Sequence, residues 1–245
     1  MKIQTFSRYE FKYVLNYNLA KKIESEVRTF MNYDGYVHPE MGNRYVVRSL
    51  YFENNLNHNF NEKVDGIKKR SKYRIRTYSR KNTDNIPIFL EEKGRINQRT
   101  YKNRVEIDSA DLEYFYNTDC YANNLHHLRL NNKLIEKFSF DSIRKQLKPT
   151  VIIDYIRRPY INKYGLLFRA TFDSHIKSCI SQELFPDCHQ DSWLECLAGY
   201  TILEIKFERS IPPWFHRIIE CYNLKRVSVS KMVIGMEACK LAYDI

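Results

Sequence analysis

Polar and apolar side chains alternate with a period of two residues along much of the chain, which predicts a β-rich fold. The segments between these stretches are turn-like or helical, and strands and helices do not alternate strictly. That order favours an α+β fold with an antiparallel sheet and flanking helices. The eight predicted strands are 8–15, 45–53, 71–79, 86–93, 100–107, 150–157, 166–173 and 201–208.

Other segments carry apolar residues at helical spacing. The clearest is 18–31, for which Asn18 is a suitable N-cap. Ser109 is predicted to cap a short helix in the same way. No repeat or linker divides the chain, so residues 1–245 are expected to form a single domain. The remaining predicted helices are 111–116, 125–146, 214–222 and 228–243.

The composition points to an anionic partner. Hydrophobic residues make up 43% of the chain, enough for a sizeable core, and the formal net charge is +11. A field of that sign attracts nucleic acid, an acidic membrane or a phosphorylated substrate, and net charge alone does not choose among them. Only 7 of the 245 residues are Gly, which argues against a glycine-rich phosphate loop.

The chain shows neither a signal-peptide pattern nor an apolar run approaching the ~20 residues of a membrane span. Its six cysteines form no C-x-x-C pair and lie among apolar neighbours, as is typical of reduced thiols. A cytoplasmic protein is therefore expected. Cys188, His189 and Cys196 resemble part of a zinc site, but a fourth ligand at suitable spacing is missing.

Charged side chains gather on one face of nearly every predicted strand, because residues two apart share a face. Lys72, Arg74 and Arg76 are the clearest set. A single strand of this kind is typical of a sheet with one solvated face. Here, however, six or seven strands each carry cations, usually with an acid nearby. Eight strands are about the number that closes a small barrel, so the charged faces can instead line a lumen.

A cationic lumen would be destabilised when empty, by about 4 kcal/mol for each pair of like charges ~4 Å apart at an effective dielectric of ~20. A bound polyanion would relieve that repulsion. Phosphate suits the side chains, because Arg binds it through two hydrogen bonds and Lys as a point charge. The Glu residues would then hold a divalent cation together with phosphate oxygens.

Short motifs along the chain resemble those of the triphosphate tunnel metalloenzymes, a CYTH-like superfamily. The closest resemblance is to the polyphosphate polymerase branch named VTC, after the vacuolar transporter chaperone complex. The resemblance runs from about residue 8 to residue 236, and the motifs fall in the expected order. They are Arg8-Tyr9-Glu10-Phe11-Lys12-Tyr13, Ser49-Leu50-Tyr51-Phe52-Glu53, Lys72-Tyr73-Arg74-Ile75-Arg76, Leu90-Glu91-Glu92-Lys93, Thr100-Tyr101-Lys102-Asn103-Arg104, Tyr155-Ile156-Arg157, Phe168-Arg169-Ala170-Thr171-Phe172-Asp173, Ile202-Leu203-Glu204-Ile205-Lys206 and Ser230-Lys231-Met232.

This resemblance implies a closed antiparallel eight-stranded β-barrel that forms a tunnel. It also implies transfer of the γ-phosphoryl group of a nucleoside triphosphate, with ATP expected, onto a growing polyphosphate chain. Glu204 would be the main ligand of a Mn²⁺ or Mg²⁺ ion, Tyr155 would donate a hydrogen bond to phosphate, and Ser230 and Lys231 would contact the chain near one mouth. Glu10, Arg104 and Lys206 share the charged strand faces and join the substrate-binding set. The implied phosphate ligands are Lys12, Arg74, Arg76, Lys93, Lys102, Arg157 and Arg169.

Three positions depart from the family pattern. Arg8 stands where hydrolytic and cyclase members have a Glu, which fits holding a long anion better than activating a water. Ser228 stands where the polymerase branch has a Lys, with Lys225 and Arg226 as the nearest candidates to compensate. Arg95 stands where that branch has a His.

Two alternatives remain open from the sequence. An enzyme on the same fold could hydrolyse inorganic triphosphate or an organic triphosphate. A non-catalytic module could bind polyphosphate or nucleic acid, since residues 70–81 are basic with interleaved aromatics, although nucleic acid is not the expected partner. The sequence leaves the oligomeric state undetermined, and also whether a membrane-protein partner brings the chain to a membrane surface.

Overall fold

The computed structural model describes residues 8–35, 37–83, 86–117, 132–163, 167–187 and 192–243. Within these ranges ten strands form one antiparallel sheet in the order β1-β10-β8-β7-β3-β4-β5-β6, with β2 added to β7 and β9 to β8. All eight predicted strands are present, and the two short strands β2 and β9 were not predicted. The strands are β1 Tyr9–Asn16, β2 Met31–Tyr33, β3 Tyr45–Glu53, β4 Lys69–Thr77, β5 Ile88–Ile96, β6 Arg99–Ile107, β7 Lys148–Asn162, β8 Phe168–Ile180, β9 Leu194–Glu195 and β10 Tyr200–Phe207.

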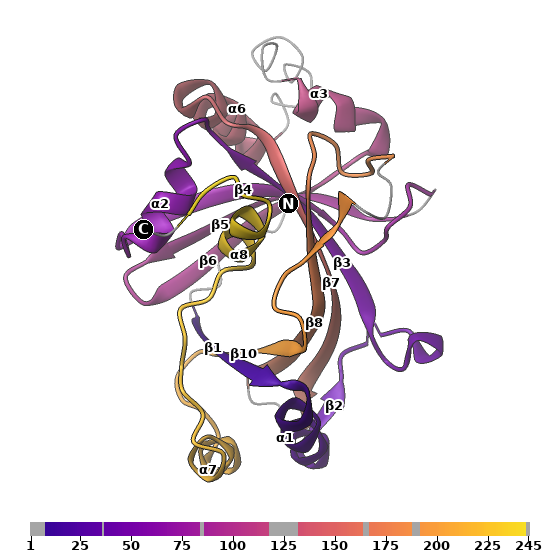
Figure 1. Ribbon diagram of the computed structural model, residues 1–245, viewed down its shortest axis with the longest axis vertical. Helices are drawn as coiled ribbons and strands as arrows, with labels where there is room; N and C mark the ends of the chain where they lie inside the picture. Colours follow the sequence, from indigo (N-terminus) through magenta and orange to yellow (C-terminus); the bar gives the residue numbers. More distant parts are fainter. Residues whose placement is uncertain are drawn as a thin grey trace.

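The sheet curves until its two edge strands, β1 and β6, approach one another (Figure 1). One isolated antiparallel bridge joins them, in which Thr100 N donates to Arg8 O at 3.1 Å and Arg8 N donates to Thr100 O at 3.4 Å. The predicted α+β tunnel fold is thus confirmed. The closure between the edge strands is a single bridge, however, and not the continuous ladder that a fully closed barrel would have.

The helices flank this curved sheet. They are α1 Tyr17–Phe30, α2 His58–Val64, α3 Leu112–Tyr116, α6 Lys133–Lys145, α7 Pro213–Cys221 and α8 Lys231–Ala238, with short 3₁₀ turns at Pro39–Met41 and Ser109–Asp111. No helix in the described part of the chain has the length and apolar character needed to cross a membrane.

Several predicted helix boundaries were wrong. Asn16, not Asn18, caps α1, because its side chain accepts a hydrogen bond from Leu19 N at 2.9 Å. Asp108, not Ser109, caps the 3₁₀ turn before α3. The helix α8 is shorter than the predicted 228–243, α2 was not predicted, and residues 125–131 of the predicted helix 125–146 lie outside the described residues.

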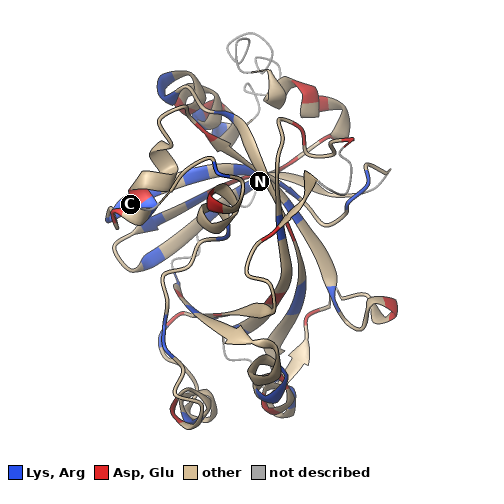
Figure 2. Cartoon of the chain, in the orientation of Figure 1, with Lys and Arg blue, Asp and Glu red and all other residues tan. Residues whose placement is uncertain are grey.

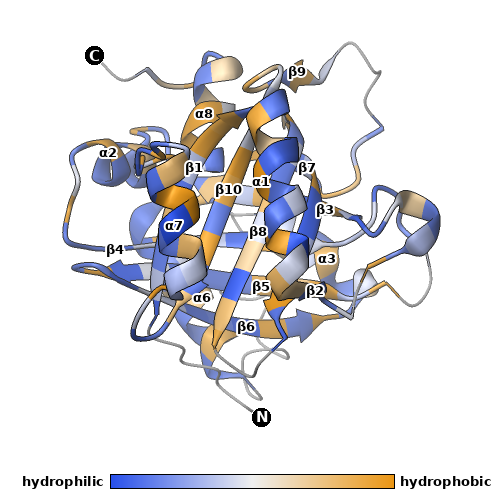
Figure 3. Ribbon diagram, turned by 90° about the horizontal axis from the view of Figure 1, so that it is seen from below, coloured by the Kyte–Doolittle hydropathy of each residue, from blue (hydrophilic) through white to orange (hydrophobic). Residues whose placement is uncertain are grey.

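The two-residue alternation sorts the side chains of each strand between two environments. On the outer face Tyr13 lies opposite Leu203 and belongs with it to one buried cluster, which the helices α1 and α7 cover (Figure 3). One residue along, Lys12 lies opposite Glu204 and faces the interior of the barrel. Each fully buried aliphatic or aromatic side chain in such a cluster contributes about 1.5–3 kcal/mol, so packing of the helices onto the outer face fixes the charged face inward.

Two further apolar clusters complete the core. The helices α3 and α6 pack on the other half of the sheet, over β3, β4, β5 and β6. The helix α8 packs with residues of β3 and β7 on the inner side of the sheet, including Tyr51 and Tyr155. A β-carbon at Gly235 would lie only 2.1 Å from Ile153 Cδ1, which shows how closely α8 approaches β7.

Candidate active site: a cationic tunnel

A cavity of about 520 Å³ lies inside the barrel. Its walls include twelve Lys and Arg side chains but only three carboxylates, counted over the described residues. Figure 2 shows the basic residues along the strands that surround it. All fourteen site residues predicted from the sequence line this cavity, namely Glu10, Lys12, Arg74, Arg76, Lys93, Lys102, Arg104, Tyr155, Arg157, Arg169, Glu204, Lys206, Ser230 and Lys231.

Glu204 on β10 forms the centre of one charged cluster. Its Oε1 lies 2.7 Å from Lys231 Nζ and 3.3 Å from Lys12 Nζ, and its Oε2 lies 3.2 Å from Lys206 Nζ and 3.4 Å from Arg157 Nη2. Burial favours the neutral acid, but Lys231 and Lys12 outweigh it and hold the pKa of Glu204 well below its usual range. Glu204 is therefore an ionised carboxylate that four cations surround.

Asp173 on β8 fixes two of those cations from behind. It accepts hydrogen bonds from Arg157 Nε and Nη2, both at 2.7 Å, and lies 2.6 Å from Lys231 Nζ. The Asp173 side chain is fully buried and does not line the cavity. Its role follows from this position: it orients Arg157 and Lys231 toward the lumen.

Glu91 on β5 does the same on the opposite wall. Arg74 donates to Glu91 Oε2 from Nε at 2.8 Å and from Nη2 at 2.6 Å, and Lys102 Nζ donates to Oε1 at 3.2 Å. Arg74 also donates to Tyr51 Oη at 2.9 Å. Glu91 is fully buried, and although burial favours its neutral form, Arg74 and Arg76 hold its pKa well below the usual range.

Arg76 carries the row of cations further along β4. It donates to Ser49 Oγ at 2.9 Å and to Tyr155 Oη at 3.3 Å. Because Tyr155 accepts here, its own hydroxyl hydrogen can still donate to an anion in the lumen. At one end of the cavity Arg169 contacts Asp34, and the Arg104 guanidinium lies 4.6 Å from the ring centre of Phe89.

Some lysines in the cavity lack enough nearby carboxylate to keep their usual basicity. Burial, together with nearby cations, lowers the pKa of Lys72 and of Lys206 to about 7 and that of Lys102 to about 8. Lys12 differs, because Glu204 and Glu10 offset its burial and raise its pKa. A polyanion in the lumen would favour the charged form of every one of these lysines.

Lys72 and Tyr51 also line this cavity, and the predicted site did not include them. Lys72 donates to Ser230 Oγ at 3.1 Å, and Tyr51 accepts from Arg74. Lys72 was visible in the alternating pattern beside Arg74. Tyr51 carries no charge, so alternation of charge could not single it out. Burial would raise the pKa of Tyr51, but Arg74 and Lys72 outweigh it and lower the value to about 7.

The residues present fit a divalent cation that takes most of its ligands from phosphate. Mg²⁺ is usually held through one or two carboxylates plus substrate phosphates. Glu204 and Glu10 offer these carboxylates. The two lie close together, because Lys12 Nζ is 3.3 Å from Glu204 Oε1 and 3.5 Å from Glu10 Oε1. The described residues contain no group of three or more His, Cys, Asp or Glu side chains that could hold a metal on its own. Cys196 of the zinc alternative contacts Ser178 Oγ at 3.2 Å, and Cys188 and His189 lie outside the described residues.

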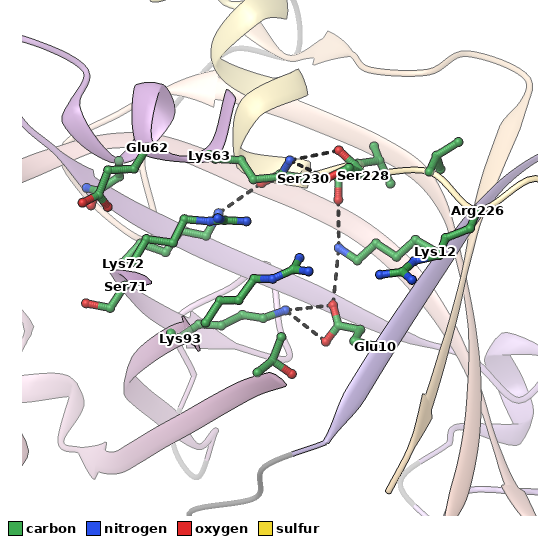
Figure 4. A pocket seen from close by; sticks show the side chains of 17 residues that line it. Glu10, Lys12, Glu62, Lys63, Ser71, Lys72, Lys93, Arg226, Ser228 and Ser230 are labelled. Carbon is green, nitrogen blue, oxygen red and sulfur yellow. Dashed lines mark hydrogen bonds and ion pairs between the residues drawn. The ribbon is translucent and has the colours of Figure 1, made fainter. Parts of the chain in front are cut away.

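A second cavity, of about 370 Å³, adjoins the first and shares six lining residues with it, among them Lys12, Lys72, Lys93 and Ser230 (Figure 4). Lys63 on α2 reaches this mouth and donates to Ser228 O at 3.0 Å and to Ser228 Oγ at 2.8 Å. An ammonium group therefore lies beside Ser228, where the family pattern has a Lys. Of the two cations named as candidates to compensate, Arg226 lines the mouth and Lys225 does not.

The fold and the cation-lined cavity define the class, a tunnel fold with a cationic lumen. An adenylate cyclase candidate from Bacillus halodurans has a similar structure, with 14% identity, coverage of 91% of this chain and 93% of that one, and a TM-score of 0.52. An adenylyl cyclase candidate from Hippeastrum, described as having a dominant triphosphatase activity, is also similar, with 12% identity, coverage of 94% and 95%, and a TM-score of 0.53. At such identities the likeness concerns the fold.

The family follows from the sequence itself. The model of the VTC domain matches residues 7–240, nearly the whole chain. The chain belongs to the VTC domain family. No curated protein matches the chain.

Proposed function

We propose that this chain is a polyphosphate polymerase, which transfers the γ-phosphoryl group of ATP to the end of an inorganic polyphosphate chain. The excess of twelve cations over three carboxylates around one lumen carries this proposal. So large an excess exceeds what a single triphosphate would neutralise, but it suits a nucleotide and an acceptor chain held together. The membership of the VTC family supports the same reaction.

The chemistry asks the protein mainly for positioning and charge neutralisation. A terminal oxygen of the acceptor chain attacks the γ-phosphorus of ATP and forms a new P–O bond. The bond from the γ-phosphorus to the β,γ-bridging oxygen breaks, and its electron pair leaves on ADP. The products are ADP and a chain longer by one phosphate. The acceptor oxygen is already ionised at neutral pH, so no proton has to be removed.

The residues of the tunnel take distinct parts in this reaction. Arg74 and Arg157, oriented by buried carboxylates, hold the phosphates in line. Lys12 and Lys231 neutralise charge that develops near Glu204. A Mn²⁺ or Mg²⁺ ion, when bound with Glu204 as its main ligand, would supply further charge neutralisation at the phosphate oxygens.

The ion pairs also weigh against hydrolysis. Water must lose a proton to attack, and the carboxylates that could accept it are poor bases. Burial favours the neutral form of Glu10, but Lys93 outweighs it and lowers the pKa of Glu10 far below its usual range, and Glu204 is held ionised in the same way. Lys93 Nζ donates to Glu10 Oε1 at 3.1 Å and to Oε2 at 3.2 Å, and these contacts stabilise the ionised carboxylate.

The test is incubation of the purified protein with ATP and Mn²⁺, with and without a short polyphosphate primer, followed by electrophoresis and polyphosphate staining. We expect a ladder of long chains. Arg76→Ala should lower the rate about 100-fold, the scale for losing one preorganised donor. The matched control is Lys22→Ala on the exposed side of α1, with melting temperatures measured for both variants. Orthophosphate without a ladder would identify a triphosphate hydrolase instead.

A further inference from the structure

The tunnel changes its chemistry along its length. On the inner face of β4 and β5 the cross-strand pairs run in order from Arg70 with Arg95, through Lys72 with Lys93 and Arg74 with Glu91, to Arg76 with Phe89, and every one of these residues except Glu91 lines one of the two cavities. Tyr78 follows on the β4 side and also lines the cavity. At a rise of about 3.4 Å per residue, Arg70 and Tyr78 are about 27 Å apart. One end is thus cationic and the other aromatic.

In-line transfer requires that the two substrates come from opposite directions. The attacking and leaving oxygens lie on opposite sides of the phosphorus. In a tunnel, the nucleoside must then lie toward one mouth and the acceptor chain toward the other. The side chains at each mouth determine whether that mouth suits the nucleoside or the acceptor chain.

The aromatic end is formed by Tyr45, Tyr78 and Phe89 from three neighbouring segments. The ring centres of Tyr45 and Tyr78 are 5.6 Å apart and those of Tyr78 and Phe89 6.4 Å, and all three residues are half-buried. The Arg104 guanidinium lies 4.6 Å from the Phe89 ring centre. Half-exposed rings combined with an Arg plane are the surfaces on which bases stack, independently of sequence.

The cationic end is formed by Lys63, Arg70, Arg95 and Arg226 around the second cavity, which the carboxylates Glu10 and Glu62 also line. Figure 4 shows Lys63 and Arg226 at this cavity. The segment that carries Arg226 is fastened across this mouth. Val227 N donates to Lys12 O at 2.9 Å, and Lys12 Nζ donates to Val229 O at 3.0 Å. The mouth therefore presents cations from α2, β4, β5 and the segment before α8, a distribution that suits an extended polyanion better than a compact one.

We infer that the nucleobase of the nucleotide stacks at Tyr45, Tyr78 and Phe89, and that the polyphosphate chain leaves past Lys63 and Arg226 at the opposite mouth. This inference rests on the proposed function and adds the direction of the chain. It also assigns Lys63, contributed by α2, to the position beside Ser228 that holds the emerging chain.

Binding measurements with two pairs of variants test this direction. Calorimetric titration of the whole chain would use three probes: a non-hydrolysable ATP analogue, tripolyphosphate and long-chain polyphosphate. Tyr78→Ala and Phe89→Leu should each weaken the ATP analogue about fivefold or more and leave tripolyphosphate unchanged. Lys63→Ala and Arg226→Ala should each weaken long-chain polyphosphate up to about fivefold and leave the ATP analogue unchanged.

Matched controls come from residues that line neither cavity. Phe140→Ala on α6 and Lys22→Ala on α1 remove an exposed ring and an exposed ammonium, and neither should change any of the three affinities. Thermal unfolding of each variant checks that it folds.

Each outcome bears on the inference. The crossed pattern described above supports it. The reverse pattern, or equal affinities of the wild type for the ATP analogue and tripolyphosphate, would overturn it while the polymerase proposal stands. A folded wild-type protein that binds none of the three anions would refute the proposed function, and the inference with it.

Discussion

The replacement Glu204→Gln separates the structural and functional roles of the central carboxylate. Glutamine keeps the shape of the side chain and removes its charge. Four cations, Lys12, Arg157, Lys206 and Lys231, lie within 3.4 Å of Glu204 in the native protein. The variant leaves these cations with one carboxylate fewer in a buried space.

The size of the effect follows from these contacts. Each N–O contact near 3 Å is worth about 5 kcal/mol at an effective dielectric of 20, before desolvation is subtracted. Removing one partner of a buried ion pair costs about 3–5 kcal/mol in measured cases, because the other charge is left uncompensated. For a chain of this size that is a fall in melting temperature of about 10 °C.

The assay is thermal unfolding with and without tripolyphosphate. Phosphate in the lumen supplies the missing negative charge, so tripolyphosphate should raise the melting temperature of Glu204→Gln more than that of the wild type. The exposed carboxylate Glu106 on β6 gives the matched control Glu106→Gln, which should melt like the wild type. A Glu204→Gln protein as stable as the wild type without ligand would refute the reasoning, because it would mean that the cations need no counter-charge.

Two further predictions concern pH and packing. The pKa of Lys72 is about 7 in the folded chain, below the ~10.4 of an unfolded lysine. Between these two pH values the unfolded state therefore binds one more proton than the folded state. Because of this difference, the free energy of unfolding should rise with pH across that window. Lys72→Met should flatten this rise, and a melting-temperature series against pH that is equally steep in both proteins would contradict it. A β-carbon at Gly94 would lie 2.0 Å from Tyr101 Cζ, so Gly94→Ala should cost about 1–3 kcal/mol in urea unfolding. Adding Tyr101→Ser should recover most of that cost, and a double variant no more stable than Gly94→Ala would show that the clash is not with this ring.

The strands and the charged lumen could be predicted from the sequence because one periodicity encodes both. Alternation places Lys72, Arg74 and Arg76 on one face whatever the register, and the apolar residues between them need the helices on the other face. The strand boundaries agree least at β7 and β8, which run several residues beyond the prediction. Their extensions pair with β2 and β9, and pairing between distant segments leaves no local signal.

The partner of each cation could not be predicted, because it depends on the register between strands. The side chain of Glu91 meets Arg74 since these residues lie opposite one another on β4 and β5, and nothing in the spacing of either strand fixes that pairing. The sequence also gave no reason to expect α2. This helix has seven residues, and the Glu53 side chain accepts hydrogen bonds from Asn59 N and Phe60 N, both at 3.0 Å, at its N-terminus. Glu53 therefore caps a helix, although it belongs to a motif shared with the family.

Carboxylates buried behind the wall of the barrel explain how so cationic a lumen can fold and how it would hold an anion. Glu91 and Asp173 are fully buried behind the wall and hold Arg74 and Arg157 in fixed orientations, so these guanidinium groups are in place before a phosphate arrives. Because the phosphate then has no side chains to reorganise, less of its binding energy is lost. Within the described ranges no carboxylate forms an ion pair with Lys72, and burial, together with the nearby cations Lys93 and Lys12, lowers its pKa. Holding its charged form in the lumen therefore has a cost. If polyphosphate binds as proposed, its negative charge would remove that cost, so the residues that destabilise the ligand-free protein would also be the ones that favour the ligand.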